Sequence, residues 1–217
     1  MSRDVLTAAR AELVSALAKL DLLLDDVDTT PPPSAQPSPP LPTPLAWGAK
    51  VSPAFRQRIR TTGEDFGFDP NWLMACIAFE TMETFRADIR PIRNGKRLSS
   101  AVGLIQFLES TAQELKTTTD KLAAMTPEDQ IDYVWLYIRN RIRERGPIRN
   151  VEDLYMSIHW PAAMGKPNDH VMYLKDSAAY AANSSLDINK DGKITKGEAG
   201  KLVRDKLAKG LLPANVA

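Results

Sequence analysis

Glu80 is the residue whose sequence setting most favours proton-transfer chemistry. It follows an unbroken apolar run, Trp72–Phe79, which reads Trp-Leu-Met-Ala-Cys-Ile-Ala-Phe. A helix of this composition is buried on nearly all sides. Leu73, Cys76 and Ile77 precede Glu80 by seven, four and three residues, so Glu80 continues the buried stripe that they form. The sequence therefore predicts a carboxyl group that faces the protein interior.

Burial raises the pKa of a carboxyl group, because the ionised form is costly away from water. Glu80 is therefore a candidate general acid near neutral pH, as a glycosidase requires. A buried glutamate can also be a structural ion-pair partner, and this alternative stays open. Glu83 is a competing acid but lies off the stripe. Cys76 is interpreted as a packed core residue, because the two histidines, His159 and His170, come with no thiol-activating motif.

Residues 187–198 carry the complete loop pattern of an EF-hand calcium site. Oxygen-bearing side chains occupy loop positions 1, 3, 5, 9 and 12, with glycine at position 6 and an aliphatic residue at position 8. The expected Ca²⁺ ligands are Asp187, Asn189, Asp191, the carbonyl group of Lys193, Thr195 and Glu198. Because the loop occurs once, we expect a structural ion rather than a paired calcium sensor. The alternative is a degenerate loop held by hydrogen bonds alone.

Capping residues place the main helices. The predicted helix starts are Asp69-Pro70, Ser110 with Gln113, and Thr126-Pro127 with Asp129. The first helix is expected to end at about Phe85, and the third to be stopped by Gly146-Pro147. The apolar face of the third helix consists of Ile131, Val134, Trp135, Ile138 and Ile142. These residues are predicted to lie in the core.

The chain divides by composition into four segments, and the expected fold class is all-α. Residues 1–28 form an amphipathic, coiled-coil-like repeat, which we interpret as a tether that docks on a domain or self-associates through residues 5–27. Residues 29–46 are rich in proline and predict an extended linker, with an adaptor-binding ligand as the alternative. Residues 47–183 are expected to form the main helical domain, and residues 184–217 the calcium loop and a C-terminal helix.

Composition limits the classes of partner. The net charge is +1, which gives no support to nucleic-acid binding. No stretch reaches 18 apolar residues, so no membrane span is expected, and one cysteine provides no disulfide framework. Charged residues interrupt every apolar window near the N-terminus, so no signal peptide is predicted. The basic runs at residues 86–97 and 139–149 are interpreted as solvated surface, with attraction to an anionic polymer as the alternative.

The order of these motifs resembles the soluble lytic transglycosylase family and its goose-type lysozyme relatives. The matching elements are a helix ending in Glu80-Thr81, the segment Ser99–Phe107 about twenty residues later, and the helix start Ser110-Thr111-Ala112. The family has a helix ending in Glu-Ser, then Ala-x-Gly-Leu-Met-Gln, then a Thr-Ala helix start. The resemblance covers roughly residues 50–182 and implies a lysozyme-like helical domain.

The resemblance also implies roles for individual side chains. Glu80 would act first as general acid and then as base. Gly103 would let the backbone approach a sugar closely, and the Gln106 amide would bind an N-acetyl group or a hydroxyl. Ser100 is a further candidate for substrate binding.

One part of the sequence departs from the family. The family has a later Ala-Tyr-Asn-Ala-Gly segment whose tyrosine orients the acid, whereas residues 155–165 here read Tyr-Met-Ser-Ile-His-Trp-Pro-Ala-Ala-Met-Gly. Tyr155 and His159 are both candidates for the orienting residue, and ordinary packing is the alternative for each.

The function expected from this resemblance is a peptidoglycan lytic transglycosylase that cleaves the MurNAc–GlcNAc β-1,4 bond. A hydrolytic lysozyme is the alternative within the enzymes, and a catalytically inactive, calcium-stabilised wall-binding or structural module is the alternative outside them. The expected partners are glycan strands and a phage virion or tail. The protein would be made in the host cytoplasm and reach the cell wall in the virion or by holin-type release.

Overall fold

The structure, a computed structural model, describes residues 43–217 with the exception of the Arg93 side chain. Residues 44–217 form one compact unit. The predicted tether of residues 1–28, its self-association segment 5–27 and the proline-rich segment up to residue 42 lie outside the described residues.

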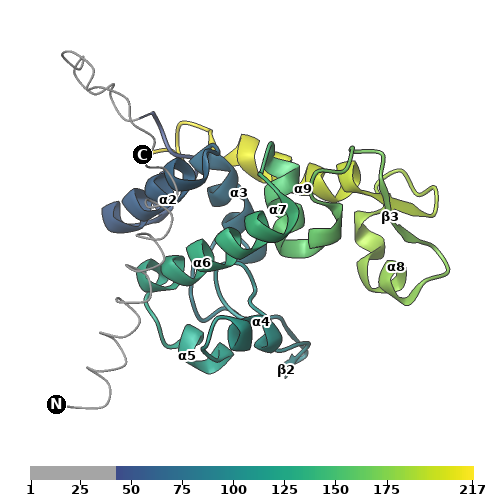
Figure 1. The fold of residues 1–217 in the computed structure, drawn as a ribbon, viewed down its shortest axis with the longest axis horizontal. Helices are drawn as coiled ribbons and strands as arrows, with labels where there is room; N and C mark the ends of the chain where they lie inside the picture. The colour runs from purple at the N-terminus through teal and green to yellow at the C-terminus, as the bar shows by residue number, and fades with distance from the viewer. Residues whose placement is uncertain (1–42) are drawn as a thin grey trace. The chain divides into compact units, whose positions relative to one another are not determined.

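The described part of the chain is mostly helical, in agreement with the expected all-α class (Figure 1). Its elements are η1 (Gly48–Lys50), α2 (Pro53–Phe66), α3 (Pro70–Glu80), β1 (Ile92–Arg93), β2 (Lys96–Arg97), α4 (Glu109–Glu114), α5 (Thr119–Ala123), α6 (Pro127–Arg145), α7 (Val151–His159), η2 (Pro161–Ala163), β3 (Val171–Leu174), α8 (Ala178–Asn183), η3 (Ser184–Leu186), β4 (Lys193–Thr195) and α9 (Lys196–Gly210). Among residues 43–217, no helix is both long and apolar enough to cross a membrane.

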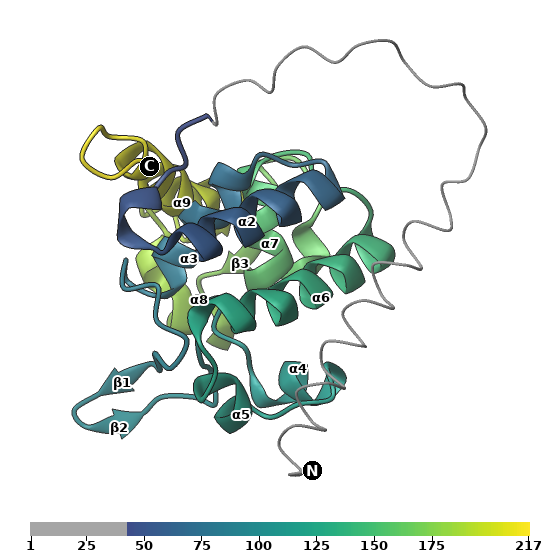
Figure 2. The same ribbon diagram turned by 90° about the vertical axis from the view of Figure 1, so that its left-hand side faces the viewer.

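Two short antiparallel strand pairs accompany the helices, although the sequence reads as helical throughout. The β1–β2 hairpin projects from the body of the unit (Figure 2). The second pair joins β3 to β4, with Tyr173 opposite Ile194. Strands of two to four residues are too short to show a hydrophobic period, which explains why the sequence pattern does not reveal them.

Two of the three predicted helix starts are confirmed. Asp69 accepts a hydrogen bond from the Asn71 amide at the start of α3, and Thr126 accepts one from the Asp129 amide at the start of α6. Proline occupies the first position of both helices, where its missing N–H group costs nothing.

The prediction of a helix start at Ser110 is wrong. Helix α4 begins at Glu109, and its N-cap residue, Leu108, has no capping side chain. Instead, the Ser100 hydroxyl oxygen accepts a hydrogen bond from the Glu109 amide at 3.1 Å. A residue of the preceding loop therefore satisfies this end of the helix, and a local capping pattern cannot reveal such a contact.

Helix α3 ends at Glu80 rather than near Phe85. The Thr81 hydroxyl donates to the Ile77 carbonyl at 2.7 Å and accepts from the Phe85 amide at 3.1 Å. These two bonds close a tight turn in which Met82, Glu83 and Phe85 all adopt positive φ angles. Left-handed backbone is unfavourable for such residues, so the surrounding contacts must hold it in place.

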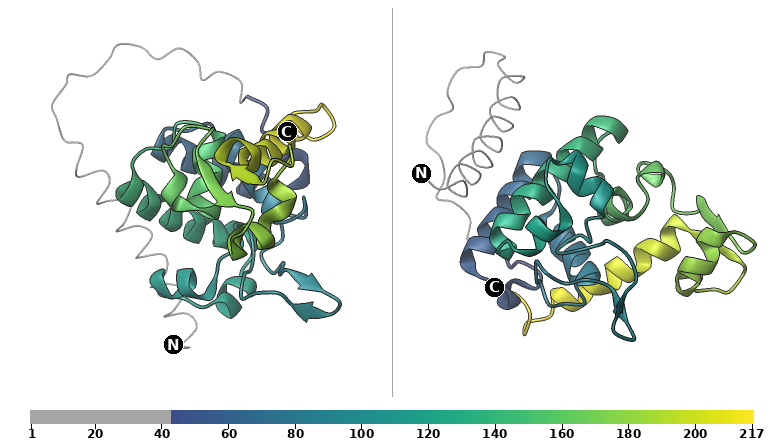
Figure 3. Two further views of the ribbon diagram at one scale, coloured as in Figure 1. Left: turned by 90° about the vertical axis from the view of Figure 1, so that its right-hand side faces the viewer. Right: turned by 90° about the horizontal axis from the view of Figure 1, so that it is seen from below.

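Helix α9 packs against both α3 and α7. In Figure 3 it extends from the lobe that contains β3 and α8 toward the opposite end of the unit, where the chain ends. At that end the Trp47 indole donates a hydrogen bond to the Lys206 carbonyl at 3.0 Å. The helix therefore connects the loop that precedes it to the two helices that carry Glu80, Tyr155 and His159.

The predicted apolar face of α6 lies in the core. Ile131, Val134, Trp135 and Ile138 are buried, and Ile142 packs against the core while partly exposed. The buried Gln130 precedes this face. Its amide nitrogen donates to the carbonyl groups of Ala87 and Leu122 at 3.0 and 2.8 Å, and its oxygen accepts from the Leu104 amide at 2.7 Å.

We expect Gln130→Met to destabilise the fold. The substitution keeps the side-chain volume but leaves one backbone N–H and two carbonyl groups without their partner, at a cost of about 2 to 5 kcal/mol in the free energy of unfolding. Urea denaturation measures this change. Gln57→Met, on the exposed side of α2, is the matched control. Equal stability of the two variants would contradict the assigned role of Gln130.

Candidate active site and calcium loop

Glu80 lies at the last position of α3 and is partly buried. Within residues 43–217, no hydrogen bond or ion pair reaches its carboxyl group. Burial is the cause that raises the pKa of this group to about 8. Glu80 is therefore protonated at neutral pH and holds a proton that it can donate.

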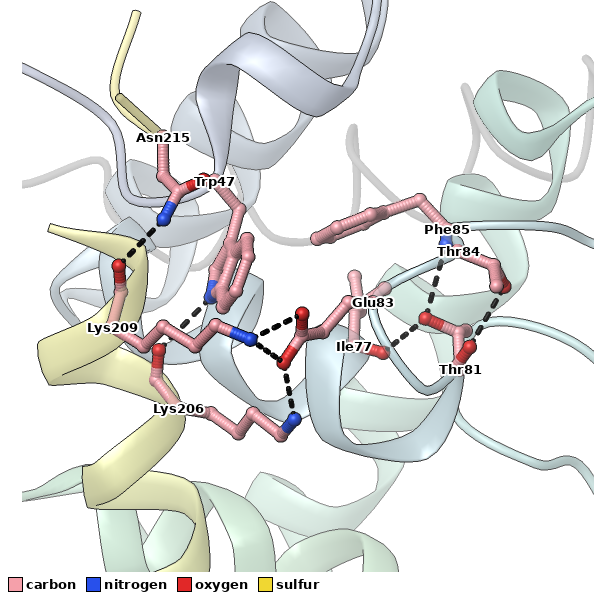
Figure 4. A network of polar contacts seen from close by, with 9 residues as sticks. All are labelled: Trp47, Ile77, Thr81, Glu83, Thr84, Phe85, Lys206, Lys209 and Asn215. Atoms are coloured by element: carbon pink, nitrogen blue, oxygen red, sulfur yellow. Dashed lines mark hydrogen bonds and ion pairs between the residues drawn. The ribbon is translucent and has the colours of Figure 1, made fainter. Parts of the chain in front are cut away.

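Glu83, the competing acid, has the opposite environment. Its carboxylate lies between two lysines of α9, 2.5 Å from the Lys206 Nζ atom and 2.7 Å from the Lys209 Nζ atom (Figure 4). Hydrogen bonds from these lysines lower the pKa of Glu83. An ionised carboxylate with two cationic partners is no proton donor at neutral pH. Its ion pairs instead hold the turn that follows α3.

Cys76 is a core residue, as expected. It is fully buried, and burial raises the pKa of its thiol well above the usual value. The charge of Glu80 raises the thiol pKa further, which shows that the two side chains are neighbours on α3. A thiol in this setting does not supply a thiolate nucleophile.

Tyr155 and His159 both lie on α7, next to the end of α3. The Tyr155 ring packs edge-on against Phe79 at 5.4 Å and stacks on the His159 ring at 5.3 Å. Burial raises the pKa of Tyr155, and the charge of Glu80 adds to the effect. Tyr155 is therefore the candidate that contacts Phe79, the residue before Glu80, whereas His159 is one ring further along.

His159 is held by a second residue. The Tyr173 hydroxyl and the His159 Nε2 atom are 3.3 Å apart, and the two rings meet at 86°. Burial lowers the pKa of His159, so the imidazole is neutral at neutral pH. This arrangement orders Tyr155, His159 and Tyr173 in a row that leads away from Glu80.

The Gly103–Gln106 segment is a tight loop that the bridge between Val102 and Phe107 closes. Gly103 has φ +79°, and a Cβ atom there would lie 2.2 Å from the Gln130 Oε1 atom. Glycine is needed at this position to admit the Gln130 side chain. The Gln106 amide nitrogen donates to the carbonyl groups of Gly103 and Ile89 at 2.9 and 3.3 Å, so its donor serves the loop.

The predicted calcium ligands run from the loop after η3 through β4 to Glu198 in the first turn of α9. Gly192 and Lys190 have positive φ angles, which produce the sharp bend that the pattern predicts. Glu198 closes the loop, because its carboxylate accepts from the Thr195 amide and hydroxyl at 2.9 and 2.8 Å. Ile194, at loop position 8, is fully buried.

Asp187, the first loop residue, is only 8% exposed and has two different carboxylate oxygens. The Oδ2 atom accepts hydrogen bonds from the Tyr180 hydroxyl at 2.5 Å and the Gly192 amide at 3.0 Å. The Oδ1 atom is buried and has no hydrogen-bond partner. A buried carboxylate oxygen without a hydrogen-bond partner is unfavourable in a folded protein.

No three His, Cys, Asp or Glu side chains within residues 43–217 gather into a group that could hold a metal. An EF-hand loop does not depend on carboxylates alone, because amide, carbonyl and hydroxyl oxygens complete its ligand set. Three of the six expected ligands are carboxylates, from Asp187, Asp191 and Glu198. The buried Asp187 Oδ1 atom, which has no hydrogen-bond partner, is a candidate Ca²⁺ ligand atom in this loop.

Several residues that shape this region were not singled out from the sequence. They are Gln130, Asp153, Tyr173 and Lys196. Lys196 occupies position 10 of the loop, where the calcium pattern makes no demand, and Asp153 is one of two acids in the first turn of α7. Neither position indicates by itself that the two side chains form an ion pair.

We expect Glu80→Gln to stabilise the protein at high pH. Because the pKa of Glu80 is about 8 in the folded state, ionising this group costs stability as the pH rises from its unfolded value near 4.5 to about 8. The increase in the free energy of unfolding caused by Glu80→Gln should be near zero at pH 4. It should reach up to a few kcal/mol at pH 9, because each unit of pKa shift corresponds to roughly 1.4 kcal/mol. Urea denaturation at both pH values measures it.

Glu83→Gln provides the matched comparison of opposite sign. The lowered pKa of Glu83 contributes stability above its unfolded pKa, and this contribution is lost as the pH falls through the folded pKa. This variant should therefore be less stable than the parent at pH 7 and equal to it at low pH. A gain for Glu80→Gln that does not change with pH would contradict the assigned pKa.

Comparison with known proteins adds no family to these observations. Neither the known protein-family models nor the curated proteins give a match to this chain. The case for a function therefore depends on the residues and their geometry.

Proposed function

We propose that this protein is a peptidoglycan lytic transglycosylase that cleaves the MurNAc–GlcNAc β-1,4 bond with Glu80 as its general acid and base. The observation that carries the proposal is the partly buried carboxyl group of Glu80, whose pKa is about 8. A glycosidase acid must remain protonated at neutral pH until it meets the glycosidic oxygen. The order of Glu80 and the Gly103–Gln106 segment, which resembles the lytic transglycosylase family, supports the choice of substrate.

The proposed reaction has two proton transfers through one carboxyl group. Glu80 donates its proton to the glycosidic oxygen while the bond from this oxygen to C1 of the muramic acid breaks. The Glu80 carboxylate then takes the proton of the C6 hydroxyl of the same sugar, and the O6 atom bonds to C1. The products are a free hydroxyl on one side and a 1,6-anhydro ring on the other, and no water is consumed.

The setting of Glu80 favours this reaction over hydrolysis. A glycosidase that uses water or a covalent intermediate works with a second carboxyl group near the acid. Burial accounts for the raised pKa of Glu80, and no second carboxylate in the part of the chain that the structure describes contributes to it. The nearest acid along the chain, Glu83, is bound to two lysines. A reaction that needs one carboxyl group fits these contacts.

Tyr155 is the proposed orienting residue. It packs against Phe79, the residue before Glu80, and His159 stacks on the Tyr155 ring. A tyrosine hydroxyl can donate a hydrogen bond to the Glu80 carboxylate after the first proton transfer, which would stabilise the charge that forms there. His159 would then support Tyr155 rather than contact the substrate.

We expect Glu80→Gln to lower cleavage of purified sacculi by about two to four orders of magnitude, because the amide cannot donate the proton. Glu64→Gln, on the exposed side of α2, is the control and should leave the rate unchanged. Mass spectrometry of the products of the parent protein should find 1,6-anhydromuramyl ends. Reducing ends would indicate a hydrolytic lysozyme. Binding to sacculi without any cleavage would indicate an inactive wall-binding module.

We further propose that residues 187–198 bind a structural Ca²⁺ ion. Asp187 supports this, because one of its oxygens is fixed by Tyr180 and Gly192 while the other is buried without a partner. The remaining ligands would be Asn189, Asp191, the Lys193 carbonyl group, Thr195 and Glu198. When bound, the ion supplies positive charge to the loop and takes no part in the proton transfers at Glu80.

We expect a chelator to lower the melting temperature of the calcium-loaded protein. An ion that binds only the folded state adds about 2.7 kcal/mol at a hundredfold excess over its Kd, which corresponds to several degrees. Asp187→Asn should weaken this calcium-dependent shift, whereas Asp205→Asn, on the exposed face of α9, should keep it. An unchanged melting temperature after calcium removal would contradict a structural ion.

A further inference from the structure

The loop residue Lys196 is buried in an ion pair with α7. Its side chain is 1% exposed, and its Nζ atom lies 2.5 Å from the Asp153 Oδ1 atom and 2.7 Å from the Lys166 carbonyl oxygen. Asp153 is itself buried, with 2% of its side chain exposed. A fully buried pair of this kind holds its partners firmly, because separating them leaves a charge without compensation.

Asp153 organises the start of α7. Its Oδ1 atom also accepts from the Gly165 amide at 2.9 Å, and its Oδ2 atom accepts from the Arg149 amide at 3.2 Å. The segment before the helix and the segment after it are thus tied to one carboxylate. A second ion pair, between Arg204 of α9 and Glu152, fixes the same turn. A shift of Lys196 would therefore displace the first turn of α7 and, with it, the rest of this helix.

The strand before Lys196 reaches α7 by a second route. Ile194 of β4 lies opposite Tyr173 of β3, and the Tyr173 hydroxyl contacts the His159 Nε2 atom at 3.3 Å. His159 stacks on Tyr155, and Tyr155 packs edge-on against Phe79, the residue before Glu80. The ion pair holds the first turn of α7, and the strand pair holds its last residue.

Both routes begin in the segment that would bind the ion. Residues 193–196 contain two of the expected Ca²⁺ ligands, the Lys193 carbonyl group and Thr195, and they also form β4 and supply Lys196. A shift of this segment cannot be absorbed locally, because Ile194 and Lys196 are packed in the interior. The position of the loop and the position of α7 are therefore mechanically joined.

We propose that Lys196 and Asp153 are positioning residues that couple Ca²⁺ binding by residues 187–198 to the placement of Tyr155 and His159 beside Glu80. The coupling rests on the Ca²⁺ site proposed above, and its catalytic consequence rests on the enzymatic function proposed there. Linkage requires the coupling to be reciprocal. A change that frees α7 from the loop should therefore alter both the calcium affinity of the loop and the effect of calcium on the exchange of α7 amides.

Hydrogen–deuterium exchange of the full chain with and without calcium tests the coupling independently of activity. In the parent protein, calcium should slow amide exchange in residues 151–159. In the double variant Lys196→Met with Asp153→Asn, which leaves no buried charge unpaired, calorimetry should still detect calcium binding while the slowing in residues 151–159 is lost. Lys201→Met removes an exposed lysine of α9 and should behave like the parent. No effect of calcium on α7 exchange in the parent, or equal slowing in the double variant, would overturn the proposal.

Steady-state kinetics on sacculi provides a second test. If Lys196 and Asp153 had a purely structural role, the response of kcat to calcium would not change in the double variant. If Tyr155 loses its correct position relative to Glu80, kcat of the double variant should fall by about ten- to a hundredfold while KM stays nearly unchanged. The kcat of this variant should also no longer respond to calcium. Lys201→Met should keep both the parent kcat and its calcium response. A calcium response that survives in the double variant would overturn the coupling. If the parent cleaves no peptidoglycan, the proposed function fails while the exchange experiment still decides the coupling.

Discussion

The packing of α9 against α3 and α7 is the interaction on which the rest of the described structure depends. Helix α3 ends in Glu80, and α7 carries Tyr155, so both sides of the candidate site are supported by a third helix. Charged contacts fix α9 at both of its ends, through Lys196 at its start and Lys206 in its last turns. Apolar packing brings the three helices together, and these ion pairs fix their register because they are directional.

Glu80 and Glu83, three positions apart in the sequence, have opposite pKa shifts because their surroundings differ. Glu80 lies against the apolar side of α3 without a cation, whereas Glu83 lies beyond the helix end between two lysines. The turn at Thr81 produces this difference, because it ends the helix before Glu83 can follow the same stripe. At neutral pH, a neutral acid and an anion therefore arise from the same residue type in one short segment.

The sequence is informative wherever the determining contacts are local. The starts of α3 and α6, the core face of α6, the burial of Cys76 and the bend of the 187–198 loop all follow from residues a few positions apart. The ion pairs of Glu83 were not predictable, because its lysine partners come 123 and 126 residues later. The sequence likewise could not distinguish Tyr155 from His159, because both lie on one helix and only tertiary packing determines which is nearer to Glu80.

Gly103 and Gln130 occupy one shared space, and this limits how the protein can change over evolutionary time. A methyl group at position 103 would overlap the Gln130 side chain, while a smaller residue at position 130 would release the backbone of three separate segments. Neither substitution is acceptable alone, so the order in which they arise matters. The two positions are expected to vary together or not at all, although 26 residues lie between them in the sequence and neither side chain carries a charge.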